Sequence, residues 1–253
     1  MKAIHNETIW ITGASSGIGQ QLAIALADAG NTVIISARNI ETLKTMASEN
    51  SNMLALTFDV SDHDQTALVA QQLAAMTTHL DRVIVNAGNC EYLDINQPDW
   101  GMMERIMKIN FFGAVNTLEI AMPLLKRSTQ RPHIVGVVSL ATALPFARAE
   151  AYGASKAAFQ YFLDALRVDL IADGIDVTAI NPGFVKTPLT DKNGFDMPFI
   201  ISSEQAAKRM MSAISRRPYQ YNFPRRLNYL LKLLACFPRF WAERASPKIN
   251  QQS

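Results

Sequence analysis

The fold is decided by residues 12–19, which read Thr12-Gly13-Ala14-Ser15-Ser16-Gly17-Ile18-Gly19. An apolar run, Thr8-Ile9-Trp10-Ile11, comes directly before this stretch. Residues 20–29 follow it with apolar side chains at helical spacing, and Gly30 is typical of a helix C-terminus. The glycines therefore stand at a strand-to-helix turn, the context in which such a pattern carries meaning.

A turn of this kind can hold an anion. Gly13 permits a tight turn, Gly17 lets the backbone approach a ligand, and Gly19 lets the helix lie close to the sheet. Free backbone N–H groups and the positive end of the helix dipole would then face the ligand. We interpret the stretch as a pyrophosphate site in preference to the alternative, a glycine-rich turn without a ligand.

The composition limits the class of protein. The chain has 253 residues, of which 49% are hydrophobic and 18% charged, so it can form one large α/β domain and is not disordered throughout. A net charge of +2 argues against a dedicated nucleic-acid binder. Residues 1–7 are too polar for a signal peptide, and no apolar run reaches the about 18 residues of a membrane span. We expect a cytoplasmic protein.

Neither cysteines nor histidines form a recognisable site. Cys90 and Cys236 are too few for a disulfide framework, and we interpret both as reduced packing residues. The histidines lack the spacing of metal ligands, so no metal site is predicted; they are His5, His63, His79 and His133.

Strand and helix patterns alternate along the chain, which predicts a doubly wound parallel α/β sheet of the Rossmann type in a single domain. The strands are nearly continuous apolar runs, as a sheet covered on both faces requires. After the first strand, we expect strands at residues 32–36, 53–58, 82–85, 133–138 and 176–180. The two longest helices are expected at residues 98–125 and 151–172.

Small or polar residues collect where these strands end. In an open parallel sheet, the carboxyl edge is where ligands bind. Each such residue alone could cap a loop, but together they make a site the stronger interpretation. They are Gly13, Ser36, Asp59, Asn86, Ser139 and Asn181.

Tyr152 and Lys156 are four residues apart at the start of a predicted helix, so both project from one face. A nearby ammonium favours the phenolate form of a tyrosine whose ordinary pKa is about 10. The pair can therefore exchange a proton with an alcohol or alkoxide. Ser139, at the end of the preceding strand, can donate a hydrogen bond to a substrate oxygen. A surface pair is the usual explanation of Tyr-x-x-x-Lys, but it leaves Ser139 and the glycine turn unexplained.

The sequence resembles the short-chain dehydrogenase/reductase family over residues of about 8 to 215. Besides residues 12–19, the resemblance rests on Asp59-Val60, Asn86-Ala87-Gly88, Asn110, Ser139, Tyr152-Gly153-Ala154-Ser155-Lys156 and Pro182-Gly183-x-x-x-Thr187. Val85 departs from the pattern, because the family often has a further Asn there, and this puts the hydrogen bonding at the strand end in question.

The resemblance implies a seven-stranded sheet and hydride transfer between NAD(P)(H) and a carbonyl or alcohol. In this family Tyr152 would be the acid/base, Lys156 would lower its pKa and hold the nicotinamide ribose, and Ser139 would polarise the substrate oxygen. Asn110 would hold a water molecule, which would fit a backbone break in its helix. The cofactor would contact Gly13, Ser15, Ser16, Gly17, Ile18, Gly19, Arg38, Asp59, Val60, Asn86, Ala87, Gly88, Tyr152, Lys156, Pro182, Gly183, Val185 and Thr187. A homodimer or homotetramer through helices 98–125 and 152–172 is also implied.

Residues 36–38, Ser36-Ala37-Arg38, indicate which nicotinamide cofactor binds. An acid at this strand end usually holds the ribose of NAD, and none is present. Arg38 can pair with the 2′-phosphate of NADP, and a charge-assisted hydrogen bond contributes about 1.5–3 kcal/mol. We predict a preference for NADP(H). The alternative is that Arg38 is an ordinary exposed loop residue.

Two segments border the substrate in the family: the loop after Ser139 and the segment after Thr187. Their apolar residues predict an apolar ketone, aldehyde or secondary alcohol as substrate, although packing of a lid explains them as well. The expected substrate contacts are Ser139, Leu144, Phe146, Tyr152 and Leu189, with Phe195, Met197 and Phe199 as further wall residues.

The composition changes after residue 215, so we separate a catalytic domain, residues 1–215, from a C-terminal extension, residues 216–253. Between Pro224 and Pro238, leucines follow helical spacing with basic residues elsewhere on the helix. This amphipathic helix, within residues 224–241, could lie on an anionic membrane, cover the substrate mouth or form a subunit contact.

Two other functions remain open. A non-catalytic dinucleotide-binding protein could sense redox state or scaffold a partner, but it has no need of the Tyr152–Lys156 pair. A ketoacyl reductase of the fatty-acid type fits poorly with the long basic and aromatic C-terminus. An NADP(H)-dependent oxidoreductase is the prediction.

Overall fold

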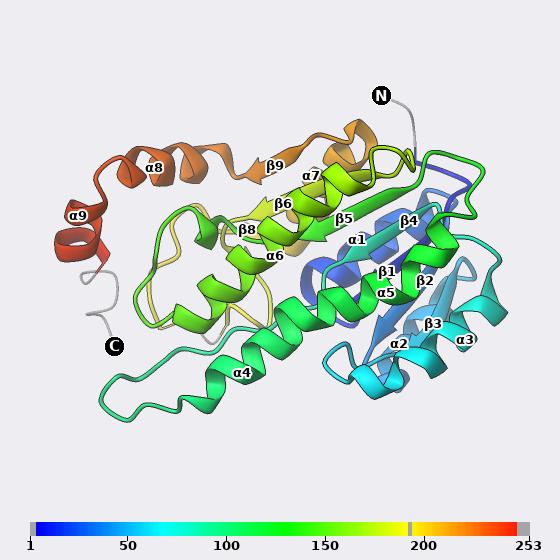
Figure 1. Ribbon diagram of the computed structural model, residues 1–253, viewed down its shortest axis with the longest axis horizontal. Coiled ribbons are helices and arrows are strands. Elements are labelled where there is room, and N and C mark those ends of the chain that lie inside the picture. Colours follow the sequence, from blue (N-terminus) through cyan, green and yellow to red (C-terminus); the bar gives the residue numbers. More distant parts are fainter. Residues whose placement is uncertain (1–3, 192–193, 247–253) are drawn as a thin grey trace.

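A parallel sheet of seven strands forms the centre of the computed structural model, which describes residues 4–191 and 194–246 (Figure 1). The strand order is β3-β2-β1-β4-β5-β6-β9, with the crossover beside β1 that opens a ligand crevice in doubly wound sheets. The strands are β1 (Thr8–Thr12), β2 (Thr32–Ala37), β3 (Met53–Thr57), β4 (Arg82–Val85), β5 (His133–Val137), β6 (Asp176–Pro182) and β9 (Gln220–Phe223). Two short strands, β7 (Val185–Lys186) and β8 (Ile201–Ser202), pair apart from the sheet.

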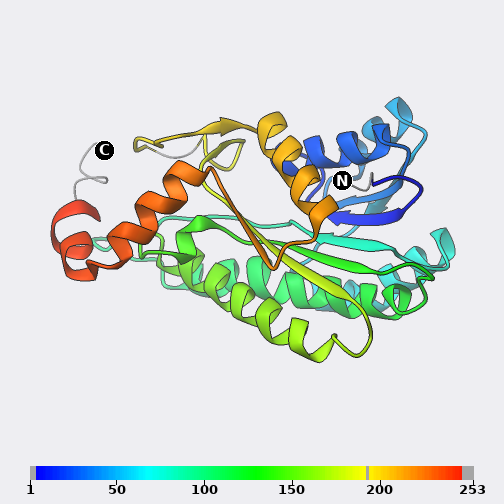
Figure 2. The same ribbon diagram turned by 90° about the horizontal axis from the view of Figure 1, so that it is seen from above.

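Helices cover both faces of the sheet (Figure 2). One face packs against α1 (Gly17–Asp28), α2 (Ile40–Glu49) and α7 (Ser203–Arg216). The other face packs against α3 (Thr66–Met76), α5 (Gly113–Leu125) and α6 (Glu150–Asp169). Helices therefore cover most of both faces of the sheet, although β3 at its edge is partly exposed, and the predicted fold class is confirmed.

The long helix expected at residues 98–125 is interrupted. It consists of α4 (Gly101–Met107), a π-helical segment (Lys108–Phe112) and α5. The helical periodicity of the sequence does not mark the boundaries between these three parts.

The chain after residue 215 begins with a strand of the sheet. β9 pairs in parallel with β6, from Ala179 opposite Gln220 to Pro182 opposite Phe223. The last strand therefore lies inside the segment that the sequence assigned to the C-terminal extension. Beyond it follow α8 (Arg225–Ala235), α9 (Pro238–Phe240) and a π-helical turn (Trp241–Ala245), which lie past the carboxyl end of β9 (Figures 1 and 2).

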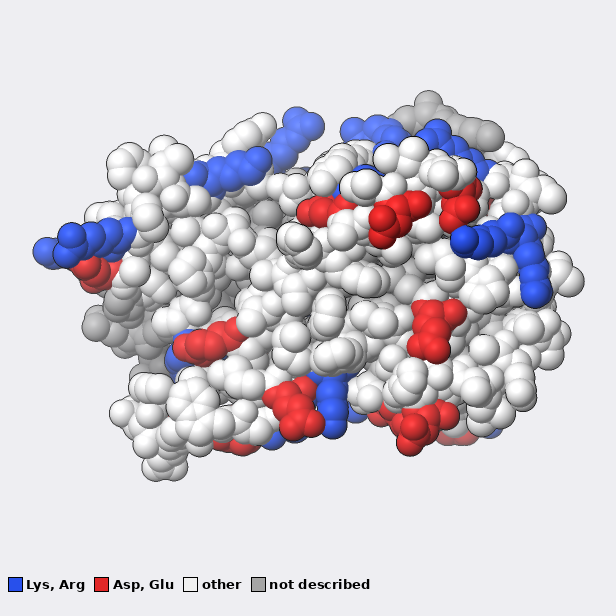
Figure 3. Space-filling view, in the orientation of Figure 1, with Lys and Arg blue, Asp and Glu red and all other residues white. Residues whose placement is uncertain are grey.

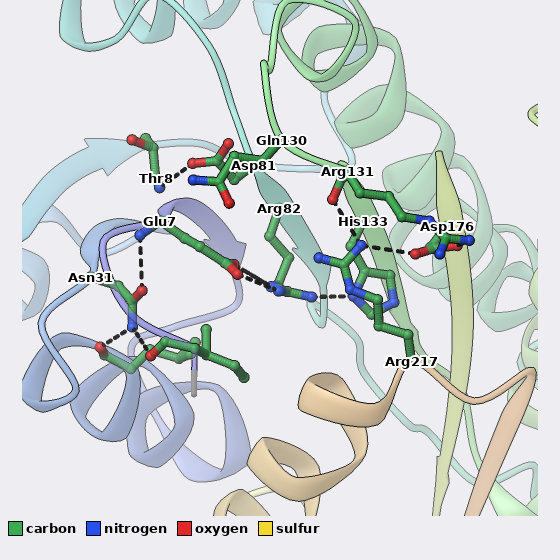
Figure 4. Close-up of polar contacts among 12 residues, drawn as sticks. Glu7, Thr8, Asn31, Asp81, Arg82, Gln130, Arg131, His133, Asp176 and Arg217 are labelled. Carbon is green, nitrogen blue, oxygen red and sulfur yellow. Dashed lines mark hydrogen bonds and ion pairs between the residues drawn. The ribbon is translucent and has the colours of Figure 1, made fainter. Parts of the chain in front are cut away.

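A buried polar network ties the amino ends of the strands together, at the edge away from the glycine turn (Figure 4). Arg82 is 1% exposed and donates hydrogen bonds to the Glu7 carboxylate at 2.7 and 3.0 Å. Its guanidinium also contacts Nδ1 of His133, whose Nε2 lies 2.8 Å from Oγ1 of Thr178. Burial lowers the pKa of His133 well below its ordinary value, and the positive charges of Arg82 and Arg217 act in the same direction. His133 is therefore neutral at pH 7.

Candidate active site

The glycine turn joins β1 to α1 in a conformation that side chains would obstruct. Gly13 has a φ of +68°, and a Cβ added there would lie 2.7 Å from the Cα of Ala87. The side chain of Asn86 donates hydrogen bonds to the carbonyl oxygens of Thr12 and Gly13, at 3.0 and 3.1 Å. Asn86 therefore links the end of β4 to the turn by hydrogen bonds. The side chain of Val85 is apolar and buried, so it can make no such bond.

The N-terminus of α1 is open toward this turn. Ser16 is the N-cap residue, and its side chain makes no capping hydrogen bond. The first backbone N–H groups of α1 therefore keep their capacity to bind an anion, and the helix dipole favours one there.

A cavity of about 480 Å³ runs along the carboxyl edge of the sheet from this turn. Every residue that the sequence assigns to the cofactor lines this cavity, from Gly13 and Arg38 to Lys156 and Thr187. These residues come from the ends of separate strands and from α6, so only the parallel topology brings them together. The cavity fits a dinucleotide, because glycines lie where a diphosphate would approach the backbone and free N–H groups lie at the N-terminus of α1.

The position of α6 over the sheet depends on Gly136 in β5. A Cβ there would overlap the side chain of Leu163 and lie 3.0 Å from Cζ of Phe159, both on α6. Without that Cβ, α6 packs close enough for Tyr152 and Lys156, in its first two turns, to reach the cavity beside Ser139.

Lys156 is 4% exposed and donates a hydrogen bond from Nζ to the carbonyl oxygen of Val137 at 3.0 Å. Burial lowers the pKa of Lys156 to about 8. Tyr152 differs from expectation: burial raises its pKa to about 12, while its hydrogen bond with Ser139 acts in the opposite direction. Lys156 is not among the groups that shift it, so the phenol is protonated at pH 7.

Asn110 lies in the π-helical segment, where the expected break in the helix is found. It is 1% exposed, and its Nδ2 donates to the carbonyl oxygen of Asn89 and to Oγ of Ser155, each at 2.9 Å. Its Oδ1 accepts from the backbone N–H of Asn89 at 2.7 Å. The side chain therefore links the loop after β4 to α6, and it does not line the cofactor cavity.

A smaller cavity of about 110 Å³ adjoins the first, and Ser139 and Tyr152 line both. Phe146, Leu189 and Phe195, three of the residues expected to border the substrate, line this pocket. Leu144 does not: it is buried against the helices after residue 224, because the turn after Ser139 directs it away from the pocket.

Several pocket residues were not among the expected substrate contacts, although covering the substrate mouth was one expected role of the helix that contains Leu227 and Leu231. Cys90 and Tyr92 follow β4, and Leu227 and Leu231 reach the pocket from α8. Both cysteines are free thiols: Cys90 is half-buried in the wall of the pocket, and Cys236 is exposed. Burial raises the pKa of the Cys90 thiol to about 11. The position of Cys90 just after Asn86-Ala87-Gly88, at the ligand-binding edge, was the available signal.

Within residues 4–191 and 194–246, no group of three or more potential ligand side chains is arranged to hold a metal ion. In the same part of the chain, no helix has the length and apolarity needed to cross a membrane.

Comparison with known proteins places the chain in a family. Residues 7–197 match the sequence model of the short chain dehydrogenases. The chain belongs to the short-chain dehydrogenase/reductase family. The resemblance stated from the sequence motifs is thereby confirmed, and the protein is an NAD(P)-dependent oxidoreductase.

Individual relatives agree with this assignment. An uncharacterized oxidoreductase of Myxococcus xanthus is 34% identical over 99% of this chain and 100% of its own. The dehydrogenase/reductase SDR family member 7B of Bos taurus is 31% identical over 74% of this chain and 60% of its own. Among solved structures, a 3-ketoacyl-(acyl-carrier-protein) reductase from Brucella melitensis complexed with NADH has a TM-score of 0.79 at 20% identity, covering 87% of this chain and 98% of that one. That likeness supports the fold.

Proposed function

We propose that this oxidoreductase reduces an apolar carbonyl compound with NADPH, with Tyr152 as the proton donor. The observation that carries the proposal is that Ser139 and Tyr152 line both the dinucleotide cavity and the adjoining apolar pocket. A carbonyl group at that junction faces both the cofactor cavity and two hydroxyl groups.

A bound nicotinamide would supply the hydride to the carbonyl carbon, and the residues of this chain would supply the proton that the oxygen must gain. Ser139 donates a hydrogen bond that stabilises the negative charge developing on that oxygen. Tyr152 then transfers its phenolic proton, which a pKa of about 12 keeps in place at pH 7. Lys156, as an ammonium, adds positive charge to the cavity and would bind the ribose. Asn110 holds the loop after β4 against α6.

The preference for NADP(H) is proposed from Arg38. Arg38 is exposed at the rim of the cavity and makes no hydrogen bond or ion pair with other described residues. Asp59 is the only carboxylate among the described residues that line the cavity, and its Oδ1 accepts from Ser61 at 2.7 Å. The guanidinium is therefore available to a 2′-phosphate, with no acid beside it to favour NAD.

Steady-state kinetics with both cofactors tests this preference. We expect a higher kcat/KM with NADPH than with NADH, and a loss of about 10- to 100-fold with NADPH alone in Arg38→Ala. Arg127→Ala, at an exposed arginine outside the cavity, is the control and leaves both values unchanged. A wild-type preference for NADH contradicts the assignment.

The pocket favours an uncharged substrate. No charged side chain of the described residues lines it, and its walls are mainly alanine, leucine and phenylalanine. A screen of NADPH oxidation with carbonyl compounds of graded chain length identifies the substrate class. We expect kcat/KM to rise with apolar chain length and to be low for carboxylated compounds. The opposite order contradicts an apolar substrate.

We also propose a homo-oligomer formed through α5 and α6. Tyr161 and Val168, two helical turns apart on α6, are 78% and 67% exposed, and Phe112 before α5 is 52% exposed. An apolar face of this kind is usually covered. Light scattering should give a dimer or tetramer for wild type and a monomer for Tyr161→Asp/Val168→Asp. A monomeric wild type contradicts the proposal.

A further inference from the structure

α8 presents apolar side chains in two opposite directions. Leu227 and Leu231 are each 3% exposed and line the apolar pocket. On the other side, Tyr229, Leu230 and Leu233 are 65%, 42% and 61% exposed. The helix is therefore both a wall of the pocket and an apolar surface toward the surroundings.

Exposed apolar residues also follow α8 along the chain. Phe237 and Phe240 are 57% and 55% exposed, so five large apolar side chains follow one another along residues 224–246, which we call the C-terminal arm. We call these five the outer face: Tyr229, Leu230, Leu233, Phe237 and Phe240.

The arm is fixed to the body of the protein, so its outer face does not result from a loose tail. Trp241 is 3% exposed, donates a hydrogen bond from Nε1 to the carbonyl oxygen of Pro145 at 2.6 Å, and packs edge-on against Phe146. At the other end, Asn222 donates to the side chain of Asn228 at 2.9 Å and accepts from Asn181 of β6. These contacts hold Leu227 and Leu231 over the pocket. They also keep the outer face turned away from the body of the protein.

Basic side chains gather along the arm, at the left end of the view in Figure 3. Glu243 is the only acid in the arm, and it is paired with Arg239 at 2.8 Å. The basic residues are all exposed: Arg225, Arg226, Lys232, Arg239 and Arg244. Two such arms facing each other in a dimer would repel, whereas an anionic surface would be attracted.

We propose that the outer face docks on an anionic lipid bilayer, and that the pocket behind α8 takes its apolar carbonyl substrate from that bilayer. The second half, uptake of the substrate from the bilayer, rests on the proposed reductase function. The first half, docking on the bilayer, does not. Leucine and aromatic side chains enter the interface while arginine and lysine stems bury along the helix and place their charges among the headgroups. Leu227 and Leu231 then lie between the lipid and the pocket.

Binding of the full chain to sedimenting vesicles tests the first half. We expect association with phosphatidylcholine vesicles that contain phosphatidylglycerol, at least about tenfold weaker association with phosphatidylcholine alone, and a loss at high salt. Leu230→Ser/Leu233→Ser should weaken binding at least about tenfold, as should Arg226→Glu/Lys232→Glu. Leu68→Ser/Met76→Ser removes two exposed apolar residues from α3 instead and should bind as wild type does.

Kinetics with two kinds of substrate test the second half. The outer residues Leu230 and Leu233 do not line the pocket, so Leu230→Ser/Leu233→Ser should keep its kcat/KM for a short water-soluble carbonyl compound. For a long-chain carbonyl compound dissolved in anionic vesicles, the kcat/KM of this variant should be at least about tenfold lower than that of wild type. Equal rates with the vesicle-held compound for wild type and variant overturn the substrate route even where vesicles bind.

The remaining outcomes are distinguishable. If wild type stays in the supernatant with anionic vesicles, the membrane proposal fails whatever the enzyme turns over. If Leu230→Ser/Leu233→Ser converts a wild-type dimer into a monomer in solution, a second copy covers the outer face and the proposal is also overturned. If vesicles bind but no carbonyl compound is reduced, the reductase function fails while the docking surface stands.

Discussion

The ammonium of Lys156 is hydrogen-bonded to the carbonyl oxygen of Val137 at 3.0 Å, and it has no carboxylate partner among the described residues. This pairing holds the charge at the end of β5, beside Ser139 and Tyr152. Because burial without an acid lowers the pKa of Lys156 to about 8, its charge is close to titrating under ordinary conditions.

Carbonyl reduction should therefore weaken in alkali. Below about pH 8 the ammonium is present, and above it the positive charge that we propose binds the ribose is lost. We expect kcat/KM for reduction to be flat below about pH 8 and to fall about tenfold per pH unit above it. In Lys156→Arg the charge persists, so the falling limb should move to higher pH. A limb that stays at pH 8 in this variant shows that another group causes it.

Gly136→Ala should reduce activity without altering any residue that lines the pockets. The added methyl group overlaps Leu163, so α6 must move away from β5 and carry Tyr152 and Lys156 with it. We expect about 1–3 kcal/mol less stability to urea and a lower kcat. Gly153→Ala, at a glycine of α6 where a Cβ meets nothing within 4 Å, is the matched control and should be neutral or stabilising. Equal effects of the two variants would show that the packing of α6 on Gly136 is unimportant.

His133 should make the protein less stable in mild acid. Its folded-state pKa is below the ordinary value of about 6.5. As the pH falls below that value, His133 therefore binds a proton in the unfolded chain while it stays neutral in the folded protein. The free energy of unfolding does not depend on His133 protonation above about pH 6.5. Below that pH it declines, by up to about 1.4 kcal/mol per pH unit. Urea titrations of wild type and His133→Gln between pH 7 and 5 measure the difference. Identical pH slopes for the two proteins would contradict a neutral His133.

The sequence predicted what depends on local pattern. The turn at Gly13, the apolar strands and the residues at their carboxyl ends were predictable because each depends on a few neighbouring residues and on one topological rule. That rule alone is enough to bring Arg38, Asp59 and Thr187 to one cavity.

The features that the sequence did not predict depend on contacts between distant segments. The π-helical turn at Asn110 was expected only from the family resemblance, because no helical pattern encodes the hydrogen bonds from Asn110 to Asn89 and Ser155. Leu144 packs with Leu227, Leu231 and Trp241, which come from a segment far along the chain, and does not line the pocket. The raised pKa of Tyr152 reflects burial under the whole fold, whereas the spacing to Lys156 suggested the opposite direction.

The central claim is that the phenol of Tyr152 supplies the proton for hydride transfer. Its most direct test is NADPH oxidation by wild type and Tyr152→Phe with the best carbonyl compound from the screen, together with NADPH binding by both proteins. We predict a fall in kcat of about 10²–10⁴-fold with an unchanged Kd for NADPH. Turnover by Tyr152→Phe at the wild-type rate would contradict the claim, and a wild type that binds NADPH but turns over no carbonyl compound would indicate a non-catalytic dinucleotide-binding protein.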